Sequence, residues 1–375
     1  MAAANVNQLH YQLPNPASSS VSSRAILPWV QALRAVAAFS VAFVHLAHDA
    51  IANGRDPAGW LKAITRFLPW DAGVDIFFVI SGLVIVHASA PLFATRGGPW
   101  IFVRRRLTRI VPLYWIMTAA FLAVLYTSRT VIHGDLGGPA FIIASFLFIP
   151  WPRPDGVMQP AFGLGWTLNY EIFFYAVFTP LVLLSRNKAI IAAALLLLLI
   201  TAYGQWRGFH NSQLTYWSNP IILEFVAGMG LAWLLQRGVS LPVLLRLGCV
   251  AAALVALHVS VPLAQSWRPL SFGIPALMLV AAAALGGLPR HPSLWHRILV
   301  RLGDASYAMY LVHPFVMRGL TVSWHIIHGH SETSGTIYVL VGLAAAQACA
   351  LLINICVERR FAIRLRRGVF PNEIV

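Results

Sequence analysis

Apolar residues gather into ten long runs along the chain, and short polar segments separate these runs. A helix needs about 20 apolar residues to cross a bilayer, and each run reaches or approaches that length. The pattern therefore predicts an all-α fold, a polytopic integral membrane bundle of about ten transmembrane helices. The predicted spans are Leu27–His48, Ala72–Ala90, Ile110–Tyr126, Gly163–Leu184, Ala189–Trp206, Pro220–Leu235, Leu244–Leu263, Leu270–Leu288, Leu302–Leu320 and Ile337–Val357.

An eleventh apolar segment, Pro139–Pro150, is too short to cross and is interpreted as re-entrant or interfacial. Residues 1–23 are polar and are predicted to form a disordered cytoplasmic N-terminus. The basic n-region of a cleaved signal peptide is missing, so the first span should stay as a helix. Residues 24–358 then form a single ten-helix membrane domain, and residues 359–375 form a basic cytoplasmic tail.

Composition and charge distribution agree with a membrane protein. Hydrophobic residues make up 58% of the chain and charged residues 10%, which excludes a soluble domain of this size. The net charge of +15 could suggest nucleic acid, but eighteen of the 27 basic residues fall in predicted inner segments and eight in outer ones. This bias follows the positive-inside rule with both termini in the cytoplasm, so nucleic-acid binding is not expected.

Cysteine and histidine spacing gives no sign of a metal site. The three cysteines lie in or beside apolar spans, without a disulfide framework. His325, His328 and His330 are expected in a solvated outer loop, because no carboxylate or cysteine joins them at ligand spacing.

Arg34 and His45 lie eleven residues apart in the first predicted span. Eleven residues make about three helical turns, so both side chains should point the same way, about 16 Å apart along the axis. A charge inside hydrocarbon costs at least about 2.5 kcal/mol, which marks such residues as candidate functional groups. The alternative is that Arg34 extends to the inner surface and His45 is a hydrogen-bonded interior histidine.

The second span holds Asp75 and Ser81-Gly82. Asp75 is a candidate acid near the outer face, or an interfacial cap at the helix start. Ser81-Gly82 is explained best by close helix packing through small residues.

Four arginines precede the third predicted span: Arg104, Arg105, Arg106 and Arg109. Guanidinium groups bind phosphate in a bidentate manner, so this cluster in front of a proline-broken helix start could grip a phosphorylated ligand. A cytoplasmic anchor on anionic lipid explains it equally well.

Glu171 should lie about 10 Å inside the fourth span, where a bare carboxylate must be protonated, paired or in a wet cavity. Its depth resembles that of His45, so the two could form an acid/base pair. An ion pair with an arginine is the alternative. Near the C-terminus, Tyr307, Tyr310 and His313 share a helical stripe, and His313 is either a ligand or relay, or a histidine bonded to a carbonyl freed by the next proline.

Together these motifs resemble the membrane acyltransferase family 3, which O-acylates extracytoplasmic glycans. The resemblance covers most of the chain, in order, through five blocks. They are Arg34 with His45, Phe77–Gly82, Arg104–Tyr114, Trp166–Tyr175, and Leu302–His313. The Trp166–Glu171 block looks closest to the exopolysaccharide-production branch. Ile172 stands where many relatives carry a second acid, so that role falls to Glu171 alone.

The resemblance implies transfer of an acetyl or other short acyl group from a cytoplasmic acyl-CoA to a hydroxyl of an exopolysaccharide or lipid-linked saccharide. His45 would be the general base or a transient acyl carrier, Glu171 would orient or relay, and Arg34 with the arginine cluster would bind donor phosphates. Supporting or acceptor-side roles would fall to Asp75, Ser81, Tyr114, Trp166, Tyr175, Tyr307 and His313.

On this interpretation acetyl-CoA or another acyl-CoA is a substrate, and no cofactor is tightly bound. Membrane lipid and polysaccharide assembly proteins are the expected partners, in a bacterial cytoplasmic (inner) membrane. The main alternative is a proton-coupled transporter or flippase of a lipid-linked saccharide, in which the same buried charges form a proton path. A structural assembly factor would need no Arg34 and His45 on one stripe.

Overall fold

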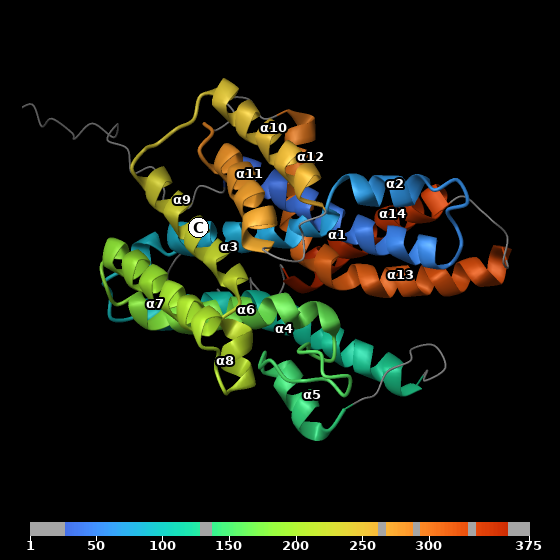
Figure 1. Ribbon diagram of the computed structural model, residues 1–375, viewed down its shortest axis with the longest axis horizontal. Helices are drawn as coiled ribbons and strands as arrows, with labels where there is room; N and C mark the ends of the chain where they lie inside the picture. The colour runs from blue at the N-terminus through green and yellow to red at the C-terminus, as the bar shows by residue number, and fades with distance from the viewer. Residues whose placement is uncertain (1–26, 128–136, 262–267, 288–292, 329–334, 359–375) are drawn as a thin grey trace, which may run out of the picture.

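The protein, seen in a computed structural model, is described over residues 27–127, 137–261, 268–287, 293–328 and 335–358. Within these ranges the chain is helical and forms no β-strand, apart from one bridge between Pro152 and Met158. Figure 1 shows the helices lying side by side in one bundle. They are α1 (Pro28–Ala52), α2 (Trp60–Phe67), η1 (Trp70–Ala72), α3 (Gly73–Ala88), η2 (Ala90–Leu92), α4 (Gly98–Thr127), α5 (Pro139–Phe146), η3 (Gly163–Gly165), α6 (Trp166–Leu181), α7 (Arg186–Trp206), α8 (Ser212–Trp217), η4 (Pro220–Ile222), α9 (Leu223–Gln236), α10 (Val243–Ser260), η6 (Pro269–Gly273), α11 (Ile274–Ala284), α12 (Leu294–Asp304), α13 (Ser306–His328), α14 (Gly335–Ile353) and η7 (Asn354–Glu358).

Six helical stretches of the described residues are long and apolar enough to cross a membrane. Two more, Pro220–Gln236 and Pro269–Ala284, are apolar but shorter. This confirms the predicted all-α membrane bundle, while the count of ten spans stays a prediction. The six are Pro28–Ala52, Trp70–Ala88, Gly98–Thr127, Arg186–Trp206, Val243–Ser260 and Gly335–Glu358.

The third predicted span begins earlier than the sequence indicated. We expected a helix start broken by Pro112, but α4 begins at Gly98 and runs for 30 residues with Pro112 inside it. A proline within a helix removes one backbone hydrogen bond, here to the carbonyl of Thr108, and membrane helices tolerate this loss when neighbouring groups compensate. The whole arginine cluster therefore lies on one continuous helix.

The predicted span Leu302–Leu320 is divided into two helices. The first, α12, ends at Asp304, and α13 begins at Ser306. Gly303 of α12 lies against the backbone of Gln31, because a Cβ there would come within 2.0 Å of the Gln31 carbonyl oxygen. The break therefore lets α12 pack against the start of α1 while α13 enters the bundle.

Helix α3 packs closely on α9 through glycine. A Cβ on Gly82 would lie 2.1 Å from the carbonyl oxygen of Phe225, and one on Gly228 would lie 2.0 Å from that of Val79. Neither position can hold a larger residue without moving a backbone. The interpretation of Gly82 as a packing residue is thus confirmed.

The short segment at 139–150 contains α5, which has eight residues. At 1.5 Å per residue it is about 12 Å long, well short of a bilayer core of about 30 Å. The predicted N-terminal segment 1–23 and the basic tail 359–375 lie outside the described residues.

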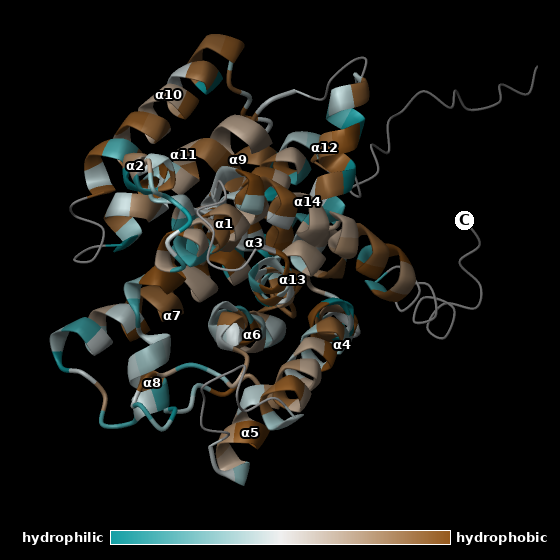
Figure 2. Cartoon of the chain, turned by 90° about the vertical axis from the view of Figure 1, so that its right-hand side faces the viewer, coloured by the Kyte–Doolittle hydropathy of each residue, from teal (hydrophilic) through white to brown (hydrophobic). Residues whose placement is uncertain are grey.

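Five helices form a closed ring of neighbours in the centre of the bundle. Helix α1 packs on α3 and α13, α3 packs on α6, α6 packs on α4, and α4 packs on α13. Figure 2, which views the bundle with α6 and α13 nearly end-on, shows α1, α3, α4, α6 and α13 grouped together. The candidate site lies inside this ring.

Candidate functional site

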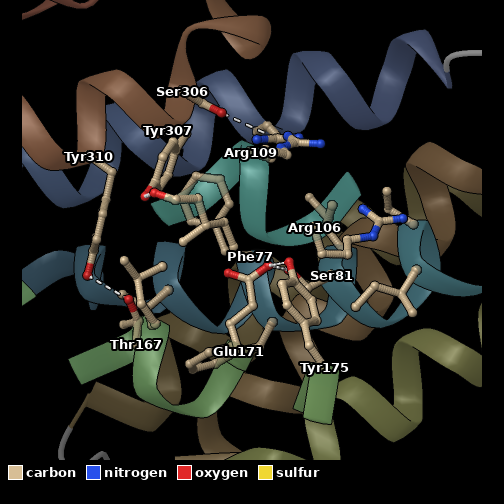
Figure 3. Close-up of a pocket in the computed structure, with 18 residues that line it drawn as sticks. Phe77, Ser81, Arg106, Arg109, Thr167, Glu171, Tyr175, Ser306, Tyr307 and Tyr310 are labelled. Carbon is tan, nitrogen blue, oxygen red and sulfur yellow. Dashed lines mark hydrogen bonds between the residues drawn. The ribbon is translucent and has the colours of Figure 1, made fainter. Parts of the chain in front are cut away.

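A cavity lies between α1, α3, α4, α6 and α13, and half of the predicted site residues line it (Figure 3). It offers about 90 Å³ to the centres of water molecules, several times the roughly 10–15 Å³ that a single water needs. The lining residues are Arg34, Val74, Phe77, Phe78, Ile80, Ser81, Val84, Ile85, Arg106, Arg109, Ile110, Thr167, Leu168, Glu171, Tyr175, Ser306, Tyr307 and Tyr310.

Arg34 lines this cavity from the second turn of α1. Its side chain is 9% exposed, and Nε donates a hydrogen bond to Oγ of Ser306 over 3.2 Å. Ser306 is the first residue of α13, so the bond ties the beginnings of the two helices together. Arg34 is therefore held inside the bundle and does not extend along its surface. Ser306 stood within a recognised sequence block, but nothing in that block distinguished it from a packing residue.

The arginine cluster divides into two pairs. Arg106 and Arg109 line the cavity, whereas Arg104 and Arg105 do not. Residues three apart on a helix share a face, which explains why this pair points inward together. Nε of Arg106 is buried and has no hydrogen-bond partner among the described residues, and Arg109 is exposed. In the described part of the chain no carboxylate lies within 4 Å of Arg34, Arg106 or Arg109.

Glu171 lines the same cavity from the second turn of α6. Its Oε1 accepts hydrogen bonds from the Tyr175 hydroxyl, over 2.5 Å, and from the Ser81 hydroxyl, over 3.2 Å. The Ser81 side chain therefore lines the cavity and binds Glu171, while the adjacent Gly82 lets α3 pack closely on α9. Glu171 and Tyr175 lie four residues apart on one helix, so their contact was predictable from helical periodicity.

The predicted pairing of Glu171 with His45 is wrong. The hydrogen bonds of Glu171 go to Ser81 and Tyr175, and His45 does not line the cavity. Counting residues along each helix placed the two groups at similar depth, but it could not fix how each helix is rotated about its axis. Helix α6 turns Glu171 towards α3, and α1 turns His45 towards α13. The alternative of an ion pair between Glu171 and an arginine is not seen among the described residues either.

His45 pairs instead with His313 of α13. Nδ1 of His45 and Nε2 of His313 are 2.8 Å apart, and the two rings stack with centroids 5.1 Å apart. His313 is completely buried, and its Nδ1 lies 3.2 Å from the carbonyl oxygen of Met309. His313 thus bonds a backbone carbonyl, but the one of Met309 and not the Tyr310 carbonyl that Pro314 leaves without its helical donor. Its second nitrogen contacts the predicted base.

Tyr310 stands between the cavity and this histidine pair. Its hydroxyl lies 3.2 Å from that of Thr167, and it donates to the carbonyl of Leu164 over 3.2 Å. Its ring centroid lies 6.1 Å from that of His313. Figure 3 shows Tyr310 and Thr167 on one side of the cavity and Arg106 and Arg109 on the other. Neither Tyr310 nor Thr167 was assigned a site role from the sequence.

Tyr307 lines the cavity one turn before Tyr310, and its hydroxyl donates to the carbonyl of Ile110 over 2.8 Å. Because Ile110 belongs to α4, this bond joins α13 to the helix that carries Arg106 and Arg109. Tyr307 thus closes one wall of the ring.

Asp75 lies outside the cavity in a separate charged cluster. Its two carboxylate oxygens accept hydrogen bonds from Arg268, over 3.1 Å to Nε and 2.7 Å to Nη2. Arg268 also donates to Asp71 over 3.1 Å. Asp75 is fully buried, so it is an ion-pair partner and makes no helix cap. No sequence pattern pointed to this pair, whose members lie 193 residues apart.

Tyr114 and Trp166 also lie outside the cavity. The Tyr114 hydroxyl donates to the carbonyl of Ser145, which fastens α5 to α4. The Trp166 carbonyl accepts a hydrogen bond from Tyr216 of α8 over 2.9 Å. Burial raises the pKa of Tyr216, and the adjacent Tyr170 raises it further, so Tyr216 remains a protonated donor. Both predicted residues therefore support the helices around the cavity.

Comparison with known proteins gives one family. A family model described as an acyltransferase domain matches residues 27–355. The chain is 33% identical to the exopolysaccharide production protein ExoZ of Rhizobium meliloti (strain 1021), over 66% of this chain and 76% of that protein. It is 26% identical to the acyltransferase MdmB of Streptomyces mycarofaciens, over 87% of this chain and 86% of that protein.

A third relative is the putative peptidoglycan O-acetyltransferase YrhL of Bacillus subtilis (strain 168). Identity is 27% over 80% of this chain, which corresponds to 51% of that longer protein. No solved structure gives a significant match to the chain.

Proposed function

Because the chain belongs to the acyltransferase family whose domain matches residues 27–355, and because it is a multi-pass membrane acyltransferase, we propose the reaction that it catalyses. It moves an acetyl or other short acyl group from acyl-CoA to a hydroxyl group of an exopolysaccharide or lipid-linked saccharide. The name of the exopolysaccharide production protein of Rhizobium meliloti, to which the chain is similar, supports this acceptor class.

The proposal rests on the order of side chains through the bundle, from arginines on one side of the cavity to a tyrosine and then a pair of histidines on the other. Arg34, Arg106 and Arg109 line the cavity with no carboxylate partner in the described ranges, and Tyr310 joins the opposite wall of the cavity to the His45–His313 pair. Guanidinium groups bind phosphate oxygens through two parallel hydrogen bonds, and a CoA donor carries three phosphates at one end and its thioester at the other. A donor bound by the arginines would thus extend its thioester towards the histidines.

Glu171 would hold the middle of the donor. A carboxylate only accepts hydrogen bonds, and the pantetheine arm of CoA carries amide and hydroxyl donors. Glu171 lies on the cavity wall with Oε1 already bonded to Ser81 and Tyr175, which fixes the direction of the carboxylate. Its role is therefore in donor binding, and not in orienting His45.

His45 would act as general base. As the acceptor hydroxyl oxygen bonds to the thioester carbonyl carbon, the hydroxyl proton moves to His45. The carbon–sulfur bond then breaks, and the CoA sulfur leaves as a thiolate that takes this proton back from His45. The products are an O-acyl ester and free CoA, with His45 again neutral. In this structure the hydroxyls of Tyr310 and Thr167 meet across the path, so that contact must open before the thioester reaches His45.

The proposed location is a bacterial cytoplasmic membrane with both termini in the cytoplasm. The eighteen-to-eight distribution of basic residues supports this orientation. It places the beginning of α1 and the exposed Arg109 on the cytoplasmic side, where acyl-CoA is made. Polysaccharide assembly proteins would supply the acceptor from the other side.

The test is transfer of label from radiolabelled acetyl-CoA to an extracted saccharide acceptor by membranes that contain the protein. Wild-type membranes should label the acceptor, and His45→Ala should lower the rate about 10²–10⁴-fold, as loss of a general base does. His48→Ala is the matched control, because His48 is exposed on the same helix. Acceptor that stays unlabelled with wild-type protein, but crosses the membrane, would point to a transporter.

A further inference from the structure

We infer that His313 is a positioning residue that fixes the tautomer and ring orientation of His45, so that Nε2 of His45 carries the free lone pair. This inference rests on the proposed function, in which His45 is the base. A chain of hydrogen bonds runs from the backbone of α13 through His313 to the imidazole of His45.

The carbonyl of Met309 determines the protonation of His313. A carbonyl oxygen only accepts hydrogen bonds, so Nδ1 of His313, 3.2 Å away, must carry the proton. The following residue is Pro314, which has no N–H to offer to the carbonyl of Tyr310. The carbonyls of Met309 and Tyr310 can therefore both accept from the imidazole of His313. A neutral imidazole with its proton on Nδ1 has a bare Nε2.

This bare Nε2 in turn determines the tautomer of His45. Nδ1 of His45 lies 2.8 Å from Nε2 of His313, and a bare nitrogen can only accept, so His45 donates from Nδ1. Its own Nε2 then holds a lone pair. Within the described residues Nε2 of His45 has no hydrogen-bond partner, and the residue is only partly buried. The nitrogen left free is thus the one that an acceptor hydroxyl can approach.

Burial makes the arrangement selective for the neutral pair. His313 is fully buried, so a protonated His313 would place a second N–H against the donating Nδ1 of His45. The charged groups that act on His45 include His48 on its own helix and Asp71 of η1. Asp71 is bonded to Arg268, so it does not compete for Nδ1 of His45.

The experiment compares two substitutions of His313 in the full-length protein. In His313→Gln the side-chain amide oxygen can take the place of Nε2 and accept from His45. In His313→Leu the volume is kept and the acceptor is lost. Both are measured for kcat and for the KM of acetyl-CoA, alongside His45→Ala and the control His48→Leu.

We expect His313→Leu to lower kcat by at least tenfold, and by up to about 10⁴-fold, the loss seen when a catalytic histidine takes the wrong tautomer. The KM of acetyl-CoA should change little, because His313 does not line the cavity. His313→Gln should recover most of the lost kcat. A purely structural role would instead leave both variants equally impaired in kcat and in folded yield.

Nitrogen-15 NMR of histidine-labelled protein in nanodiscs reports the tautomer of His45 independently of enzymatic activity. His45→Ala is used to assign the signals. In wild type, Nδ1 of His45 should be protonated and Nε2 bare, and His313→Leu should change this state. A wild-type His45 protonated on Nε2 would overturn the inference. If His45→Ala proves fully active, the proposed function fails instead, whatever the tautomer.

Discussion

Two groups of charged side chains lie inside the helical bundle, and they handle their charge in opposite ways. Around Asp75, the guanidinium of Arg268 donates hydrogen bonds to the carboxylates of Asp71 and Asp75, and each oxygen of Asp75 accepts one of them. Around the cavity, Arg34, Arg106 and Arg109 have no carboxylate within 4 Å among the described residues, and there is room for several waters. A buried charge whose partners are present has no need of a ligand, and removing one partner destabilises the fold, whereas an unpaired charge beside open space is ready for a ligand.

The largest effect expected from this comparison concerns the two inward arginines. Replacing Arg106 and Arg109 together by lysine should raise the KM of acetyl-CoA about 10–100-fold, because lysine cannot reproduce bidentate phosphate contacts of about 1.5–3 kcal/mol. Steady-state kinetics with varied acetyl-CoA measures it. The matched control is the double lysine variant of Arg104 and Arg105, on the same helix but outside the cavity. Equal effects in the two double variants would reduce the whole cluster to a lipid anchor.

A smaller effect is expected at the carboxylate of the cavity. Glu171→Gln should lower kcat/KM for acetyl-CoA about tenfold, because a neutral amide accepts weaker hydrogen bonds than a carboxylate. Glu224→Gln is the comparison variant, since Glu224 is a second carboxylate inside the bundle, 3% exposed, that does not line the cavity. Per folded molecule, Glu224→Gln should retain wild-type kcat/KM. Loss of activity in Glu224→Gln, with Glu171→Gln unaffected, would instead place the region around Glu224 in the reaction site and the cavity carboxylate outside it.

The smallest effect on activity, and the largest on stability, is expected at Asp75. Asp75→Asn removes the ion pair between Asp75 and Arg268, and breaking a buried ion pair costs about 3–5 kcal/mol when one partner is removed. We expect the lower end, because the Arg268 side chain is 29% exposed. Thermal unfolding in detergent should therefore occur at lower temperature, while activity per folded molecule changes less than about twofold. An inactive variant with wild-type unfolding would move Asp75 into the reaction site.

The positions that follow from helical periodicity within one helix could be predicted from the sequence. Arg34 could be placed inside the bundle from the apolar residues around it, and Arg106 with Arg109 share a face because they lie three residues apart. The contact of Glu171 with Tyr175, four residues away, follows from the same rule. The all-α membrane fold follows from the lengths of the apolar runs.

Contacts between distant helices could not be predicted in the same way. Each depends on how a helix is rotated and shifted against its neighbours, and one sequence does not determine those parameters. The His45–His313 pair joins residues 268 apart, and the Asp75–Arg268 pair joins residues 193 apart. The break at Ala305, which sets where α13 begins, likewise depends on the close approach of Gly303 to Gln31.

The most direct test of the central claim is whether acetyl-CoA occupies the arginine-lined cavity. Ser81→Cys places a thiol on the cavity wall in a background without Cys249, Cys349 and Cys356, and Leu107→Cys places one on the exposed face of α4. The account predicts that saturating acetyl-CoA slows labelling of the thiol at position 81 by a maleimide reagent and leaves labelling at position 107 unchanged. Equal labelling at position 81 with and without acetyl-CoA, in protein that still transfers the acyl group, would contradict it.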